Sequence, residues 1–179
     1  MKRYLILLAF SLSFINLYSQ HLSFLGIQLG QSEAAIDRQL QQKGFQYAGV
    51  NNYALTKKYI GKFWIYPYTI LNTEVENGKV TSILVGPDPD VYVKISDFDH
   101  LVNNLDKKYG SHQNIFNLFK NSFYCEKGYS WRVKGGYIAA FYSINPVTNK
   151  IIMSIRYMDN TNSRVVLRKG QKRDTSNDL

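Results

Sequence analysis

The sequence predicts an α+β fold, with an antiparallel sheet of about seven or eight strands and two helices on one face. Two segments have helical periodicity with start and stop signals, and each is followed by a run of strand-like segments. Short turns join those segments, so neighbouring strands should be antiparallel. Two helices can cover only one face of such a sheet, and we expect its other face to meet solvent or a partner.

The first helix is expected over residues 33–43. Ser32 can cap its first turn, Ile36 and Leu40 share one face, and Gly44 can end it. The sequence therefore supplies a beginning, an apolar stripe and an end for this element.

The second helix is expected to begin at Ser96, which forms a capping box with Asp99. Gly110 follows a basic last turn and can end the helix. Four apolar residues recur between them at helical spacing: Phe98, Leu101, Val102 and Leu105.

Eight further segments have the composition and spacing of strands. They cover residues 45–50, 53–60, 63–76 and 79–85 after the first helix, and 122–126, 129–134, 137–144 and 151–158 after the second. Asn77-Gly78 predicts a tight hairpin turn, because both central positions of that turn need a positive φ. Pro67 has no amide donor, so its segment should lie at a sheet edge or carry a bulge.

The chain divides into three parts. Residues 1–20 have a basic start, an apolar run and a polar exit, which is typical of a secretory signal peptide, and no cysteine follows to carry a lipid anchor. Residues 21–160 then form a single α+β domain, built from two helix-plus-strands halves at about 24–86 and 91–158. Residues 161–179 are expected to be a flexible, basic, polar tail. We therefore expect a periplasmic or extracellular protein with no transmembrane segment in its mature chain.

The mature chain is basic. The full sequence has a formal net charge of +9, and removal of Lys2 and Arg3 with the signal peptide lowers it to +7. Nucleic acid is not expected as a partner, because an exported protein seldom meets it and no aromatic residues are interleaved with the basic ones in the tail. We expect a monomer whose partner is a protein or glycan of the cell envelope.

Three short stretches near the front of the mature chain carry a resemblance. They are F-L-G-I-Q-L-G at 24–30, L-Q-Q-K-G-F at 40–45 and G-K-F at 61–63. In these the chain resembles a group of uncharacterised secreted proteins of Bacteroidetes, which implies an exported domain and supplies no catalytic residue. The doubled helix-plus-sheet plan is also similar to secreted β-lactamase-inhibitor proteins and outer-membrane assembly lipoproteins, but a similarity of fold does not determine function.

No catalytic, metal or cofactor signature is present. His21, His100 and His112 do not pair at metal-ligand spacing. Cys125 is the only cysteine and alternates with apolar neighbours, so a buried, inert thiol is the favoured interpretation. The less favoured alternatives are an intermolecular disulfide and a nucleophile that pairs Cys125 with His100 or His112. No catalytic residue, metal or cofactor is therefore predicted.

The open face of the sheet is the predicted binding surface. Period-two alternation places five residues on it: Trp64, Tyr66, Tyr68, Arg132 and Arg156. Trp, Tyr and Arg are favoured at binding hot spots, and the aromatic rings can also stack on sugars. The sequence thus favours an exported, non-enzymatic binding or interaction module. An ordinary solvated sheet face is the simpler interpretation of the same residues, and the functional alternative is a secreted or periplasmic hydrolase with a site in the cleft between the halves.

Overall fold

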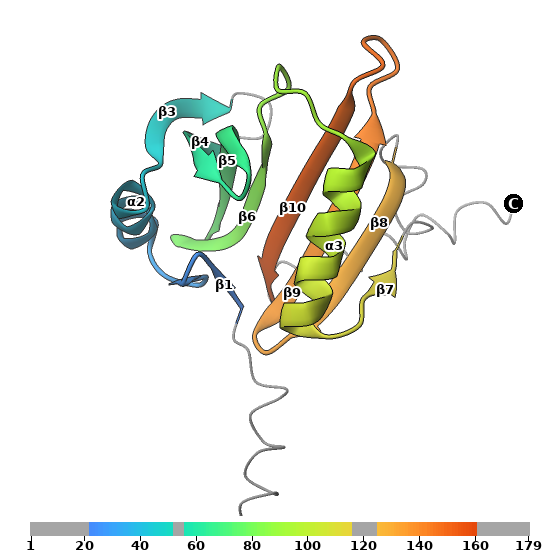
Figure 1. The fold of residues 1–179 in the computed structure, drawn as a ribbon. Helices are drawn as coiled ribbons and strands as arrows, with labels where there is room; N and C mark the ends of the chain where they lie inside the picture. The colour runs from blue at the N-terminus through green and yellow to red at the C-terminus, as the bar shows by residue number, and fades with distance from the viewer. Residues whose placement is uncertain (1–21, 52–55, 116–124, 161–179) are drawn as a thin grey trace, which may run out of the picture.

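The computed structural model describes residues 22–51, 56–115 and 125–160 (Figure 1). The predicted signal peptide and basic tail lie outside these residues, as do residues 53–55 of the second expected strand and 122–124 of the fifth. The described residues form two helices and two antiparallel sheets, which confirms the predicted α+β class.

The main sheet has eight strands in the order β3-β4-β5-β6-β10-β9-β8-β7, and each neighbouring pair is antiparallel. The strands are β3 (Gln46–Asn51), β4 (Thr56–Phe63), β5 (Tyr66–Glu76), β6 (Lys79–Pro87), β7 (Gln113–Asn114), β8 (Cys125–Val133), β9 (Gly136–Ile144) and β10 (Ile151–Asp159). The described residues of the expected strands 122–126 and 129–134 thus fall in one strand, β8, apart from residue 134, and its pairing shifts between Cys125 and Lys127.

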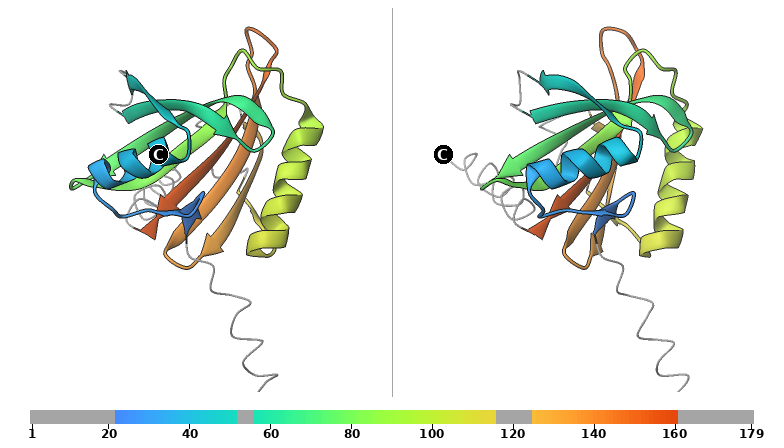
Figure 2. Two further views of the ribbon diagram at one scale, coloured as in Figure 1. Left: turned by 60° about the vertical axis from the view of Figure 1, so that its left-hand side comes forward. Right: turned by 90° about the vertical axis from the view of Figure 1, so that its left-hand side faces the viewer.

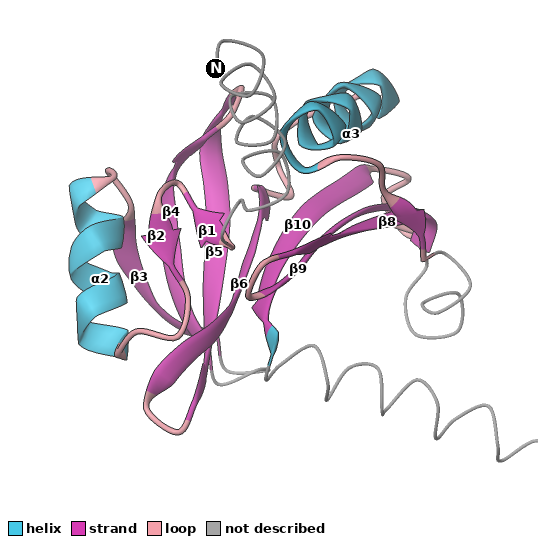
Figure 3. Cartoon of the chain, turned by 90° about the horizontal axis from the view of Figure 1, so that it is seen from below, coloured by secondary structure: helices cyan, strands magenta, loops and turns pink. Residues whose placement is uncertain are grey.

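Both helices cover the same face of this sheet, which we call the inner face. Helix α2 (Glu33–Gln42) lies along β3–β6 and α3 (Ile95–Tyr109) along β8–β10 (Figures 2 and 3). Buried residues of both helices belong to one core cluster with inner-face residues of the strands. Those of the strands include Tyr59, Leu71, Ile83, Val85, Trp131, Ile138, Met153 and Ile155. The opposite side is the outer face.

A small hairpin that the sequence analysis did not predict lies between the two halves. Strands β1 (Ser23–Phe24) and β2 (Ile27–Gln28) pair with each other apart from the main sheet. The fully buried Phe24 ring contacts the rings of Phe45 at 5.9 Å, Phe63 at 5.2 Å and Tyr157 at 5.4 Å between centroids. Because these rings come from both halves, Phe24 joins them into one core.

The start of α2 was predicted correctly, whereas that of α3 was not. Ser32 accepts a hydrogen bond from the Ala35 amide. Helix α3 begins at Ile95, before the predicted Ser96, and the Asp97 carboxylate accepts the Lys94 amide at 3.1 Å. Asp97 is in the first turn, where a carboxylate can satisfy an amide that has no helical partner, so it replaces the predicted Ser96–Asp99 box.

The turns of the first half follow the backbone chemistry of their residues. Asn77 and Gly78 have φ values of 52° and 73°, as the predicted hairpin turn requires. The Pro67 strand is β5, which lies inside the sheet between β4 and β6, so the edge position is wrong. The pairing of β4 with β5 is instead irregular between Gly61 and Phe63, opposite Pro67, which agrees with the alternative of a bulge.

Among the described residues, neither helix has the length and apolar character needed to cross a bilayer.

Candidate binding site on the open face of the sheet

The strand register places polar and apolar side chains in rows across the outer face. Lys58 pairs with Asn72, Asn72 with Leu84, and Leu84 with Arg156, so these four residues of β4, β5, β6 and β10 form one cross-strand row. Ala139 of β9 continues the row beyond Arg156. No described helix lies over these residues, since α2 and α3 both pack on the inner face.

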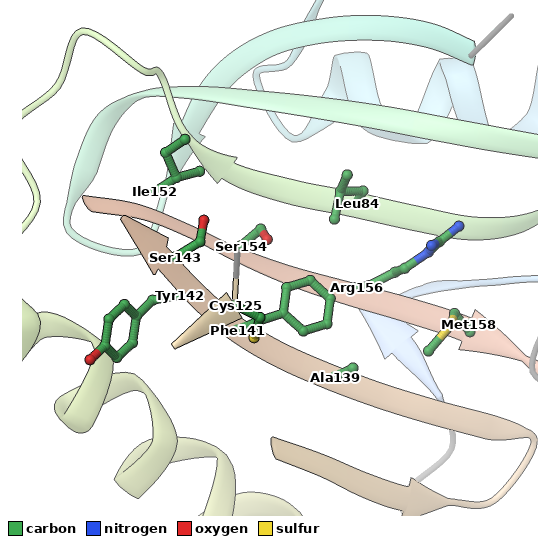
Figure 4. Close-up of a pocket in the computed structure, with 10 residues that line it drawn as sticks. All are labelled: Leu84, Cys125, Ala139, Phe141, Tyr142, Ser143, Ile152, Ser154, Arg156 and Met158. Carbon is green, nitrogen blue, oxygen red and sulfur yellow. The ribbon is translucent and has the colours of Figure 1, made fainter. Parts of the chain in front are cut away.

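A pocket of about 300 Å³ opens on this face between β6, β8, β9 and β10 (Figure 4). Its larger lining side chains are apolar and surround small ones, which leave the space unfilled. The apolar lining residues include Leu84, Phe141, Ile152 and Met158, and the small ones include Ala139, Ser143 and Ser154. The hollow therefore follows from small side chains placed between large ones on adjacent strands.

Gly86 keeps β6 and β10 close together beside this pocket. A Cβ atom added at Gly86 would lie 2.4 Å from the carbonyl oxygen of Met153 and 3.4 Å from the Cβ of Ser154. Any larger residue would push β10 away from β6, so the glycine is needed for close strand approach.

Arg156 provides the charged side of the pocket, and its charge is already paired. Its Nε donates to the Ser82 hydroxyl at 3.0 Å, and its Nη2 donates to the Glu74 carboxylate. All three side chains come from neighbouring strands, β10, β6 and β5. The pocket is therefore mostly apolar and has a neutralised ion pair at its rim.

A shallower groove continues from the pocket toward β4. It shares Leu84, Ile152 and Ser154 with the pocket and reaches Lys58 and Asn72. The Asn72 side-chain oxygen is buried without a hydrogen-bond partner. A buried polar atom without a partner is uncommon in folded proteins. The Asn72 amide is therefore a group in this groove whose hydrogen-bonding potential the described protein groups do not satisfy.

Three of the five predicted site residues lie on the outer face. Tyr68 is 64% exposed, and Arg156 borders the pocket. Arg132 is exposed on β8, with its guanidinium carbon 6.0 Å from the centre of the Tyr137 ring. Tyr68 and Arg132 do not line the pocket, so the described structure does not bring these three into one site.

The predicted placement of Trp64 and Tyr66 is wrong. Trp64 lies in the turn between β4 and β5, with φ of 55°, and packs partly buried against the core. Tyr66 is buried on the inner face, where its hydroxyl donates to Asp97 of α3 at 2.7 Å. The irregular pairing near Pro67 breaks the alternation on which the prediction relied, so Tyr66 and Tyr68 do not share a face.

Cys125 lines the pocket as a buried thiol whose Sγ–H donates to the Lys127 carbonyl at 3.1 Å. Burial, with a smaller contribution from Glu126, raises the pKa of this thiol above its usual value. Because the thiolate is the nucleophilic form, this environment does not favour a nucleophile.

The described residues contain one aspartate–histidine pair. The Asp106 carboxylate lies 3.0 Å from His112 Nδ1 and accepts the Trp131 indole N–H at 2.9 Å. Such a carboxylate can orient an imidazole for proton transfer. His112 lines neither the pocket nor the groove, however, and its ring packs 4.2 Å from that of Tyr129.

Among the described residues, no group of three His, Cys, Asp or Glu side chains is arranged to hold a metal ion.

The chain matches no protein-family model, and no curated protein or solved structure shows a significant similarity to it. The resemblance to secreted proteins of Bacteroidetes and the fold similarity to β-lactamase-inhibitor proteins therefore stay predictions.

The pocket residues themselves were missed by sequence reasoning. One signal was available: residues 152, 154, 156 and 158 form the outer set of an alternating strand, in which an arginine and a serine lie between apolar residues. What the sequence did not give was the strand order, which places β6 beside β10 and brings Leu84 next to this set.

Proposed function

We propose that the protein is an exported binding module, and that its outer sheet face holds an apolar group of its ligand in the pocket between β6 and β9. The observation that carries this proposal is the pocket itself, about 300 Å³ in volume and lined mainly by apolar side chains. Ligand sites in proteins are typically apolar hollows of about 300–1,000 Å³ with a few polar groups that fix orientation.

The chemistry of the lining supports binding over catalysis. Arg156 is held by Ser82 and Glu74, so it can orient a ligand but is not free to stabilise a developing negative charge. The thiol of Cys125 is buried, and burial raises its pKa, which disfavours the nucleophilic thiolate. Export, which rests on the signal-like residues 1–20, would place this binding face in the cell envelope or outside the cell.

The proposal is tested by comparing ligand retention by the wild type with that by a variant whose pocket is blocked. The folded wild-type domain would be incubated with a total lipid and small-molecule extract of the cell envelope and then repurified. Mass spectrometry would identify the compounds that stay bound. Ser154→Leu places a large side chain in the pocket and should abolish retention, whereas Ser111→Leu makes the same change in an exposed loop and should not. Equal retention by the wild type and Ser154→Leu would contradict the proposal.

A hydrolase is the second candidate, and the Asp106–His112 pair is the observation that favours it. The pair lies between the end of α3 and β8, within the second half of the sheet, and not between the two halves as expected. The test is hydrolysis of simple activated esters by the purified domain. If the activity is present, is lost in His112→Gln and is kept in Ser154→Leu, the protein is a hydrolase and the binding proposal is wrong. Equal rates in the wild type and His112→Gln would exclude a role for the pair.

A further inference from the structure

We propose that the ligand of the outer face is a linear alkyl carboxylate of medium length, whose chain lies in the pocket and whose carboxylate meets Lys58 in the adjoining groove. This inference rests on the proposed binding function and names the ligand class of the same site.

The size of the pocket limits the length of the chain. A volume of about 300 Å³ holds roughly ten groups of the size of a water molecule, at about 30 Å³ each, and a methylene group is of similar size. An alkyl chain of roughly eight to twelve carbons therefore fills the space. Its contacts would be Leu84, Phe141, Ile152 and Met158, which line the pocket.

Arg156 is not the group that receives the carboxylate. Its guanidinium already has a carboxylate partner in Glu74 and a hydroxyl partner in Ser82. A second anion placed there would be repelled by Glu74. The ion pair thus leaves the pocket electrically balanced, as suits an uncharged chain.

Lys58 is the cation that remains for the head group. It lines the groove that joins the pocket through Leu84, Ile152 and Ser154, and among the described residues no acid lies within ion-pair distance of it. Two strand spacings, about 10 Å, separate the backbones of Lys58 and Leu84 in their shared row. The flexible lysine side chain shortens that gap, so one linear molecule can reach both places.

Asn72 supplies a polar neighbour for the head group. It lies between Lys58 and Leu84 in the row, and its side-chain oxygen has no hydrogen-bond partner. Rotation of the amide exchanges oxygen and nitrogen, so the same side chain can donate to a carboxylate beside the lysine. The groove therefore offers a cation and an amide at one end and an apolar hollow at the other.

Calorimetric titration of the folded domain at pH 8 with two matched series tests the inference. The probes are the saturated carboxylates from hexanoate to dodecanoate and the primary alcohols of the same chain lengths. Affinity should rise about fourfold per added methylene until the pocket is full, and the carboxylate should bind at least about fivefold more tightly than its alcohol. Ser154→Leu should remove binding of both series.

Two lysines on one strand provide the matched pair for the head group. Lys58→Gln should make carboxylate and alcohol bind equally, and Lys62→Gln, which changes a residue outside the groove, should leave the preference intact. Equal binding of carboxylate and alcohol by the wild type, or an unchanged preference in Lys58→Gln, would overturn the carboxylate assignment and leave the proposed function standing. If neither series binds, the alkyl ligand class is overturned, and the retention experiment decides the proposed function separately.

Discussion

The two faces of the main sheet satisfy their polar groups in different ways. On the inner face, aromatic side chains donate to carboxylates of the helices: Tyr59 to Asp37, Tyr66 to Asp97 and Trp131 to Asp106. On the outer face, Arg156 is paired within the sheet, and Lys58 and Asn72 line an open groove. The aromatic hydroxyl and indole groups of the inner face thus find their acceptors on the helices, whereas the outer face has an open groove that contains a lysine and an asparagine.

This difference explains why aromatic content alone is a poor guide to a binding surface. A tyrosine or tryptophan can bury its ring in the core if a helix carboxylate accepts its single polar hydrogen. Trp131 is 1% exposed and Tyr59 is fully buried under this arrangement. The pocket of the outer face, in contrast, is lined mostly by aliphatic and small residues, and Phe141 and Tyr142 are its aromatic ones.

The largest expected loss of stability comes from the inner core. Phe24→Ala removes the ring that contacts rings of both halves, and it should lower the free energy of unfolding by about 3–5 kcal/mol. Urea unfolding followed by tryptophan fluorescence measures this change. A loss below about 1 kcal/mol would show that the halves do not share one core.

Alkaline pH should lower the free energy of unfolding through the buried tyrosines of the inner face. Burial raises the pKa of Tyr59, Tyr66 and Tyr157 well above the usual value near 10, and the neighbouring Asp37 and Asp97 raise the first two further. A raised folded-state pKa gives stability that is fully present below pH 10 and lost as the pH rises, because only the unfolded chain then releases the phenol protons.

The expected loss above pH 10 is up to about 1.4 kcal/mol per pH unit for each of these tyrosines. Unfolding free energies between pH 8 and 11, with tyrosinate absorbance recorded in parallel, measure it. Tyr59→Phe should have a shallower decline than the wild type. An unfolding free energy that stays constant up to pH 11 would mean that these phenols ionise as easily in the folded chain as in the unfolded chain.

A matched pair of tyrosines two residues apart separates the faces directly. Tyr66→Phe removes a hydrogen bond to a carboxylate on the inner face and should cost about 1.5–3 kcal/mol, whereas Tyr68→Phe on the outer face should change stability by less than about 0.5 kcal/mol. Thermal and urea unfolding of both variants give the comparison. Equal effects would mean that the register shift near Pro67 does not assign them to opposite faces.

A smaller loss of stability than that of Tyr66→Phe is expected at Cys125. Cys125→Ala removes a small buried group and should cost about 1 kcal/mol, with slow labelling of the wild-type thiol because it is buried and its pKa is raised. Native-state reaction with a thiol reagent, compared with the unfolded chain, measures the labelling. Labelling at the unfolded rate would contradict the burial.

The fold class and most strands could be predicted because they depend on local patterns. The helix around Leu101 and the turn at Asn77-Gly78 are fixed by spacing and by backbone conformation within a few residues. Tyr66 could not be placed, since an extra residue in its own strand, opposite β4 near Pro67, decides its side. The pocket could not be predicted either, because it needs Leu84 and Arg156, 72 positions apart in the numbering, as neighbours in one row.

The central place of β10 has a consequence for how the chain acquires this fold. Strand β10 is the last described strand and pairs with β6 on one side and β9 on the other. Until residues 151–159 are available to pair, β6 and β9 both present unpaired edges, the form of a strand that is most prone to wrong pairing. Completion of the sheet therefore depends on contacts between distant parts of the sequence, which are slow to form, and we expect the nascent chain to be vulnerable to aggregation until its final strand arrives.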